Sequence, residues 1–347
     1  MILGRRKTWT GTAIGSAALA VVTLLAIQGC SSAASAGSAA ADTPAGPSLS
    51  ISAAQTAYDS YLAASDSAAS QGDETQGLAI AGGAQWSQLK AQYTALATTG
   101  IPVTRYEYGR PVFYVPALTG YPQWFMVAVP RQTDSGGHLG PSVNTILLFN
   151  RFEKGAAWTL NGTVVEDQPL PAIVRDRSGY AIAVVNNDPS LLLRPDLAGA
   201  SQAAVVDEGP ASAAAAVVAG GPQTTGLYTA QAAIGRADAA QGLRYEWLAV
   251  GANYPQFELR TADGGALMLY GMYLETTTEH PGLAVGSPIP VPAAFTALFA
   301  KPNEIGYHAL QANWTYEFAA VDPPGTAHNA KVDIIGGTGS PTYSLAD

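Results

Sequence analysis

The feature that most limits the fold is an order of elements that occurs twice along the chain. Between residues 52 and 98 apolar side chains recur at helical spacing, and from residue 103 the sequence becomes rich in β-branched and aromatic residues. Residues 211–240 and 243–335 repeat this order. Because each pattern marks one kind of element, the sequence predicts helices followed by an antiparallel sheet, twice over.

Individual elements follow from the same patterns. A helix over residues 52–69, with Ser52 as its N-cap, places Tyr58, Tyr61 and Leu62 on one face, and a second helix covers residues 84–98. In the later half, helices are expected over residues 211–219 and 223–240. Asp263-Gly264 predicts a hairpin with a type I′ turn, since Asp-Gly supplies the positive φ angles of that turn. Strands are expected within 103–129, at 145–152 and 157–165, and at 243–250, 256–261, 266–277, 311–321 and 331–335.

Short sequence matches indicate a tandem duplication. Each match occurs in the same order in both halves, and the later copy is longer in its middle, which places an insertion around residues 280–302. The matched pairs are Arg105-Tyr106-Glu107-Tyr108 with Arg244-Tyr245-Glu246-Trp247, Tyr121-Pro122-Gln123-Trp124 with Tyr254-Pro255-Gln256-Phe257, Trp158-Thr159 with Trp314-Thr315, and Asp167-Gln168-Pro169 with Asp322-Pro323-Pro324.

We therefore predict an α+β fold of two tandem modules, residues 51–200 and 201–347, each a helical pair packed on a curved antiparallel sheet. This order of elements is similar to the cystatin-like or NTF2-like architecture. Such a resemblance implies a cupped sheet, in which one face covers the helices and the other face can line a pocket.

The first thirty residues resemble a lipoprotein export signal. Arg5, Arg6 and Lys7 precede an uncharged apolar run, and Ile27-Gln28-Gly29-Cys30 resembles the lipobox of bacterial lipoproteins. The resemblance implies removal of residues 1–29 and attachment of diacylglycerol, with acyl chains such as palmitate, to Cys30. The alternative is an uncleaved anchor with Cys30 as a bystander. Residues 30–50, rich in Ser, Ala, Gly and Pro, are expected to form a flexible tether on the outer face of the cell membrane.

Composition excludes several classes of function. The net charge of −9 becomes more negative when the basic signal is removed, which disfavours a nucleic-acid partner. Cys30 is the only cysteine, so no disulfide supports the fold, and the four histidines are scattered. No cofactor or metal ion is indicated.

Three stretches of the globular part resemble an uncharacterised family of actinobacterial lipoproteins. They are YEYGRPVFYVPALTGYPQWF, LRTADGGALMLY and VDPPG with KVDIIG, and the likeness extends over most of residues 50–340. The family brings no known activity, so the resemblance supports the cellular address and leaves the function open.

Catalytic motifs are incomplete. Ser87 and Lys90 have the spacing of penicillin-recognising enzymes, but the companion Lys-Thr-Gly and Ser-Asp-Asn motifs are missing from the sequence. Ser201 lacks the last glycine and the preceding strand of a nucleophile elbow. Glu275 and Glu279 lie on a predicted strand, about 13 Å apart, too far to share a metal ion.

An aromatic cluster is the remaining candidate. Tyr106, Tyr108, Tyr114 and Trp124 lie on predicted strands, where core packing is the favoured interpretation and a ligand pocket lined by one face of that sheet is the alternative. We expect a non-catalytic binding or scaffolding role at the cell envelope, with an envelope protein or a small molecule as partner. The alternative is a small-molecule pocket, with or without catalysis, in an NTF2-like cup.

Overall fold

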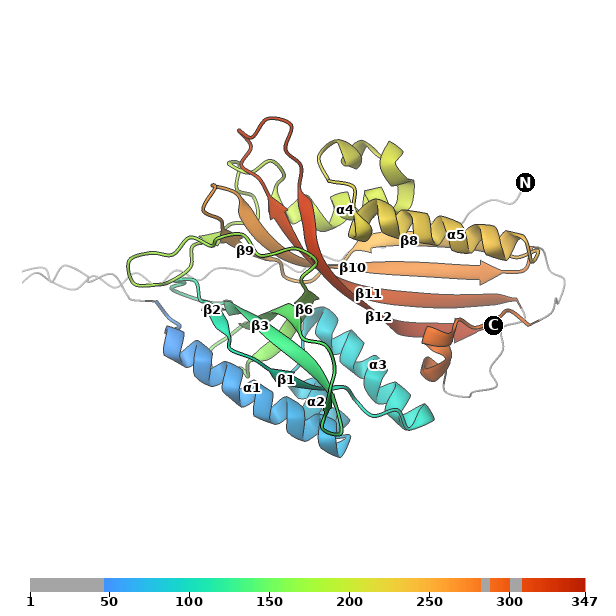
Figure 1. Cartoon of the computed structure of the whole chain (residues 1–347), viewed down its shortest axis with the longest axis horizontal. Helices are drawn as coiled ribbons and strands as arrows, with labels where there is room; N and C mark the ends of the chain where they lie inside the picture. The colour runs from blue at the N-terminus through green and yellow to red at the C-terminus, as the bar shows by residue number, and fades with distance from the viewer. Residues whose placement is uncertain (1–46, 282–287, 300–307, 347) are drawn as a thin grey trace, which may run out of the picture. The chain divides into compact units, whose positions relative to one another are not determined.

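The structure is a computed structural model that describes residues 47–281, 288–299 and 308–346 (Figure 1). These residues belong to one compact unit, Pro44–Asp347. The predicted signal of residues 1–29, Cys30 and most of the tether lie outside the described residues.

The first sheet follows three helices. α1 (Ile51–Gln71) and α3 (Gly83–Thr99) confirm the two predicted helices, while the short α2 (Glu74–Ala79) was not predicted. Ser50, rather than the predicted Ser52, caps α1 by accepting a hydrogen bond from the backbone N–H of Ala53. The strands are β1 (Arg105–Tyr108), β2 (Val112–Tyr114), β3 (Gln123–Ser135), β4 (His138–Leu139), β5 (Val143–Arg151) and β6 (Thr159–Val165). They pair in the order β1-β3-β5-β6, with β2 and β4 also paired to β3.

In the second sheet one short strand precedes two helices and the other strands follow them. The helices are α4 (Ala198–Glu208) and α5 (Leu227–Ala239). The strands are β7 (Ala183–Val184), β8 (Arg244–Gly251), β9 (Phe257–Arg260), β10 (Ala266–Glu279), β11 (Ala309–Asp322) and β12 (Asp333–Ala346). They pair in the order β12-β11-β10-β9-β7, with β8 also paired to β10.

The two sheets share one topology, which confirms the repeated order of elements. In each sheet two short strands lie along one edge of a long strand, β1 and β2 on β3 and β8 and β9 on β10, and two more antiparallel strands follow on its other edge, β5-β6 and β11-β12. The remaining short strands, β4 on β3 and β7 on β9, have no counterpart in the other sheet. An ion pair recurs at the same register: Arg105 lies opposite Asp134 in the first sheet, with 3.6 Å between their charged atoms, and Arg244 lies opposite Glu279 in the second, at 3.4 Å.

Only the first of the sequence matches falls on equivalent strands. In the second match, Gln123 is the first residue of β3, whereas the matching segment leads into β9, which begins at Phe257. β9 is the counterpart of β2, not of β3. The predicted insertion lies in the connection between β10 and β11, residues 280–308, which is longer than the β3–β5 connection, residues 136–142. The short 3-10 helix Ala293–Leu298 lies within this connection.

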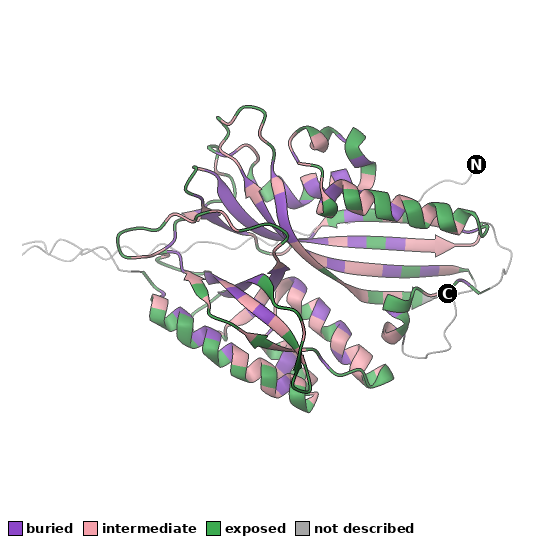
Figure 2. Cartoon of the chain, in the orientation of Figure 1, coloured by how far each residue is buried: buried purple, intermediate pink, exposed green. Residues whose placement is uncertain are grey.

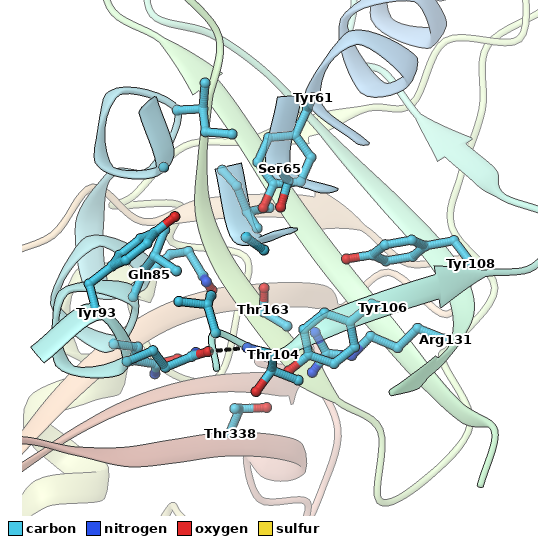
Figure 3. A pocket seen from close by; sticks show the side chains of 18 residues that line it. Tyr61, Ser65, Gln85, Tyr93, Thr104, Tyr106, Tyr108, Arg131, Thr163 and Thr338 are labelled. Carbon is cyan, nitrogen blue, oxygen red and sulfur yellow. Dashed lines mark hydrogen bonds between the residues drawn. The ribbon is translucent and has the colours of Figure 1, made fainter. Parts of the chain in front are cut away.

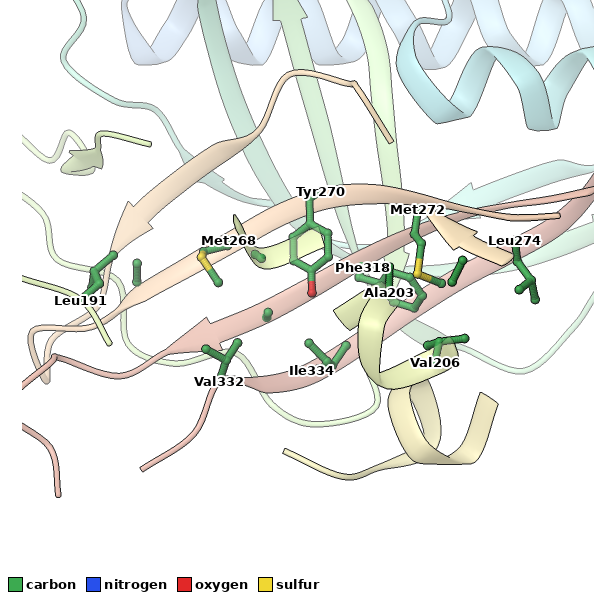
Figure 4. Close-up of a cluster of buried hydrophobic side chains, with 14 of the residues drawn as sticks. Leu191, Ala203, Val206, Met268, Tyr270, Met272, Leu274, Phe318, Val332 and Ile334 are labelled. Carbon is green, nitrogen blue, oxygen red and sulfur yellow. The ribbon is translucent and has the colours of Figure 1, made fainter. Parts of the chain in front are cut away.

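One face of each sheet packs on helices, and the opposite face packs on the other sheet. Each strand contributes to both contacts, because its successive side chains point to opposite faces. In β3, Phe125 and Val127 join the core under α1, whereas Trp124 and Met126 join a core shared with Leu267 of the second sheet. The helix-facing core of the second sheet is shown in Figure 4, with α4 beside β10 and β11. Figure 2 shows the buried residues concentrated in the strands, while most of α5 is exposed.

The packing corrects the expected position of a pocket. A pocket on the face of the first sheet that points away from its helices was the alternative to core packing, and it is contradicted, because that face and the corresponding face of the second sheet bury one another. Leu259, Leu269 and Ala319 of the second sheet are at most 2% exposed in this shared core. This shared core leaves room for only a small cavity, about 20 Å³, beside Leu148, Val164 and Leu269.

Several local predictions also differ from the structure. Helix α4 was not predicted, and residues 211–219 form short 3-10 segments at Gly209–Ala211 and Ala213–Ala216 rather than a helix. The hairpin between β9 and β10 is confirmed, but the type I′ turn is wrong: only Gly264 among its residues has a positive φ, +90°, as in a three-residue loop. Strand β7 precedes residue 200, the expected module boundary, and pairs with β9.

Candidate functional site

A polar cavity of about 60 Å³ lies on the helix-facing side of the first sheet and is called the first cup (Figure 3). A groove of about 230 Å³ adjoins it along α1 and β1, and the two share Ser65, Ala69, Thr104, Tyr106 and Tyr108. The polar side chains lining the first cup are Tyr61, Ser65, Gln85, Gln88, Gln92, Tyr93, Thr104, Tyr106, Tyr108, Arg131, Thr163 and Thr338.

The first strand and the helices are fixed to one another around this cavity. Tyr106 and Tyr108 share a face of β1 because they are two residues apart. The backbone N–H of Thr104 donates to Oε1 of Gln92 on α3 at 3.1 Å, a bond drawn as a dashed line in Figure 3. Arg105 pairs with Asp66 of α1 at 2.6 Å. These contacts hold the wall of the cup in place.

Arg131 of β3 is the only charged side chain among the described residues that line the first cup. Its exposure is 9%, and its Nε is buried without a hydrogen-bond partner. The guanidinium carbon lies 4.3 Å from the centre of the Tyr106 ring, and Figure 3 shows the two side chains together. Within the described ranges, no carboxylate lies within salt-bridge distance of Arg131. A buried cation without a counter-ion is costly, so Arg131 is a candidate recognition group for an anion.

Tyrosine hydroxyls surround this cation. Burial raises the pKa of Tyr108 to about 12, although nearby Arg131 opposes the shift both through its charge and through a hydrogen bond. Burial also raises the pKa of Tyr61. Both phenols therefore keep their protons at neutral pH and can donate hydrogen bonds. The cup thus combines a fixed positive charge with neutral donors.

The floor of the cup joins the two sheets. The backbone N–H of Thr163 in β6 donates to Oε2 of Glu317 in β11 at 2.8 Å. The N–H of Val165 donates to Oγ1 of Thr338 in β12 at 3.0 Å. Burial raises the pKa of Glu317 to about 8, against smaller opposing effects from the Thr163 N–H and the charge of Arg131. At neutral pH Glu317 is mostly protonated and provides little negative charge to Arg131.

The structure brings together two of the four predicted aromatic residues. Tyr106 and Tyr108 line the first cup. Trp124 lies in the core between the sheets, with its ring centre 5.1 Å from that of Phe257. Tyr114 packs at the edge of the same core, and the guanidinium carbon of Arg175 lies 4.8 Å from its ring centre.

Arg131, the most informative residue of the cup, was not among the residues predicted from the sequence. The predicted strands ended at Val129, whereas β3 continues to Ser135. Arg131 keeps the alternation of Val127 and Val129, so the signal available in the sequence was a charged residue at a core-facing position.

The incomplete catalytic motifs are not assembled into a site. Ser87 and Lys90 lie on α3, and Lys90 forms an ion pair with Glu74 of α2. Ser201 lies within α4, not at a turn between a strand and a helix. Glu275 and Glu279 lie on β10, as predicted.

No group of three or more His, Cys, Asp or Glu side chains within residues 47–281, 288–299 and 308–346 could hold a metal ion. Over the same ranges, no helix is both long enough and apolar enough to cross a membrane.

Comparisons with known proteins find similarity to lipoproteins of Streptomyces. An uncharacterized lipoprotein of Streptomyces avermitilis is 26% identical over 242 residues, 67% of each protein. Another uncharacterized lipoprotein, of Streptomyces coelicolor, is 26% identical over 263 residues, 69% of each protein. No solved structure matches the chain. Residues 45–342 match the family described as Domain of unknown function (DUF8094), and the chain belongs to that family.

Proposed function

We propose that this protein is a lipid-anchored, extracytoplasmic, non-catalytic binding protein that holds the anionic group of a small molecule in the first cup. The observation that carries the proposal is the buried Arg131, with an unpartnered Nε and no ion pair within the described part of the chain. A carboxylate or phosphate on the ligand supplies the missing counter-charge.

The geometry supports a ligand whose anionic group enters the first cup while the rest of the molecule lies in the adjoining groove. The cavity is small, about 60 Å³, and therefore suits a compact group such as a carboxylate or phosphate. The adjoining groove of about 230 Å³ has room for the rest of the molecule beside Tyr106 and Tyr108. Arginine suits such a ligand because its planar fork donates two parallel hydrogen bonds to one anion.

Residues 1–50 carry the proposed anchor. The names of the Streptomyces relatives support a lipoprotein. We propose that residues 1–29 are a cleaved signal, that Cys30 carries diacylglycerol and palmitate, and that residues 30–50 tether the protein to the outer face of the cell membrane. Substituting Cys30→Ala should abolish acyl labelling and leave the unprocessed precursor. Unchanged mass and detergent partition would contradict the anchor.

The remainder of the chain is proposed to form two cystatin-like or NTF2-like modules, residues 51–200 and 201–347. The shared topology of the two sheets and the repeated ion pairs, Arg105 with Asp134 and Arg244 with Glu279, support a duplication. A small molecule rather than an envelope protein is the favoured partner, because the unpaired charge lies inside a cavity and not on an exposed surface.

The binding proposal is tested with benzoate, a planar carboxylate, on the full chain in non-ionic detergent. Benzoate at ten times its dissociation constant should stabilise the wild type by about 1.4 kcal/mol, measured as a higher melting temperature. Arg131→Met should abolish this shift, and Arg131→Lys should keep only part of it, since lysine retains the charge but not the fork.

The control is Arg110→Met, which removes an exposed arginine and should leave the benzoate response unchanged. Inorganic phosphate is titrated in parallel to distinguish the two anion types. An equal response to neutral benzyl alcohol, or a benzoate response that persists in Arg131→Met, contradicts the proposal.

A further inference from the structure

The second sheet has a larger cavity, about 280 Å³, on its own helix-facing side. We call this cavity the second cup. It lies under α5, over the ends of β8, β10 and β11, and Pro290, Pro292 and Phe295 of the β10–β11 connection close one side. The remaining lining residues are Gln231, Ile234, Asp238, Gln241, Leu243, Tyr245, Thr276, Thr278, Leu310, Ala312, Trp314 and Tyr316.

The strand register shows that the two cups occupy equivalent places. In the first sheet Tyr106 and Tyr108 lie opposite Thr133 and Arg131. In the second sheet, Tyr245 lies opposite Thr278 and Trp247 lies opposite Thr276. Since the ion pairs of Arg105 and Arg244 fix the alignment, Tyr245 corresponds to Tyr106.

By the same alignment, Thr276 occupies the position of Arg131, so the second cup lacks the positive charge of the first. The hydroxyl of Thr276 donates to the backbone oxygen of Ala312 at 2.6 Å, so it is already satisfied. The hydroxyl of Tyr245 likewise donates to Oε1 of Gln231, at 2.5 Å. Asp238 is the only charged side chain among the described residues that line the cup, and it accepts a hydrogen bond from Thr278 at 3.3 Å.

Aromatic rings make up one wall of the second cup. The rings of Trp314 and Tyr316 are stacked at 5.9 Å between centres and 23° between planes. Phe295 meets Trp314 edge-on, at 5.5 Å and 87°. Trp314 and Tyr316 pack against the core with part of their surface and are only partly buried, and both also line the cup. A flat ring is the ligand shape that such a wall favours, because stacked and edge-on contacts add to the burial of apolar surface.

We propose that the second cup is a separate binding site for a neutral, planar aromatic molecule. An apolar cavity of about 150 Å³ is enough to bind benzene, so the volume of about 280 Å³ admits a two-ring compound. The duplicated modules would then bind ligands of different chemistry, an anionic group in the first cup and a neutral ring in the second.

The probe is 5-fluoroindole, a neutral two-ring compound, observed by fluorine NMR with the full chain in detergent. Wild-type protein should broaden the fluorine signal beyond the broadening given by detergent alone. Ala312→Phe, which fills the cup from the 4% exposed Ala312, should return the signal to that of detergent alone. Trp314→Leu removes the stacking surface without filling the cavity and should reduce the excess broadening at least threefold.

Matched controls distinguish loss of binding in the second cup from effects on the first cup and from loss of folding. Trp86→Leu removes a tryptophan that is 44% exposed on α3, and it should behave as the wild type. Arg131→Met should also keep the indole response, so failure of the anion proposal is distinguishable from failure of this one. Melting curves establish that each variant is folded. The inference is wrong if the wild type broadens the signal no more than detergent, or if folded Ala312→Phe and Trp314→Leu respond as the wild type does.

Discussion

Glu317→Gln should make the protein less sensitive to pH. The Glu317 carboxyl is 4% exposed in the contact between the sheets, and its Oε2 accepts the hydrogen bond from the Thr163 backbone N–H. Burial raises its pKa to about 8 from an ordinary value of 4.5. Glutamine has the shape of the protonated acid and can still accept the Thr163 hydrogen bond, but it cannot ionise.

The sign of the effect follows from where the proton is held. The folded protein keeps the Glu317 proton up to about pH 8, whereas the unfolded chain loses it near pH 4.5. The stabilisation is therefore fully present below pH 4.5 and is lost as the pH rises through this window. The loss is about 1.4 kcal/mol per pH unit for one group, on the order of 5 kcal/mol in all. Glu258 and Asp322, whose pKa values burial raises to about 8 and about 7, act in the same direction.

Urea unfolding followed by tryptophan fluorescence, from pH 5 to pH 8, measures this effect. Near pH 5 the wild type and Glu317→Gln should differ by about 1 kcal/mol or less. By pH 8 the variant should be the more stable protein, because its free energy of unfolding falls less steeply. The matched control is Glu153→Gln, at an exposed position, which should follow the wild type. Equal slopes for the wild type and Glu317→Gln between pH 5 and pH 8 would refute the reasoning.

Other predictions concern the cup and the shared core. Benzoate affinity should fall as the pH rises from 7 to 9 in the wild type but not in Glu317→Gln. The reason is that ionised Glu317 adds a negative charge near Arg131. Titration of each protein with benzoate at pH 7 and pH 9 checks this prediction. Leu269→Ala, at a position 2% exposed between the sheets, should cost about 2–5 kcal/mol of unfolding free energy in a single transition. Leu248→Ala, at a position 52% exposed, should cost about 0.5 kcal/mol or less; a similar cost for both variants would contradict the proposed packing.

Elements with strong periodicity could be predicted from the sequence. Helices α1 and α3 were found because their apolar residues recur at helical spacing, and Tyr58 and Tyr61 are indeed buried. Helix α4 was missed because its sequence, AGASQAAVVDE, contains mainly small residues with little contrast between its faces. Strand β12 runs well beyond the predicted residues 331–335, and it was cut short because the glycine-, serine- and threonine-rich residues 336–342 lack apolar alternation.

The candidate site was only partly predictable. Alternation placed Tyr106 and Tyr108 on one face of β1, and both line the first cup. The same reasoning gave Trp124 a candidate role, but the structure places it between the sheets. A strand pattern shows which residues share a face and does not show what covers that face.

The sequence by itself determined the order of helices and strands, the repetition of that order and the resemblance to a lipoprotein signal, because each depends on neighbouring residues. Only the tertiary structure decided that the two sheets pack together through the faces that point away from their helices. As a result, both cups lie on the helix-facing sides of the sheets. It also decided that Arg131 is buried without a counter-ion. These properties depend on contacts between residues far apart in the chain, such as Thr163 with Glu317, and no local pattern records them.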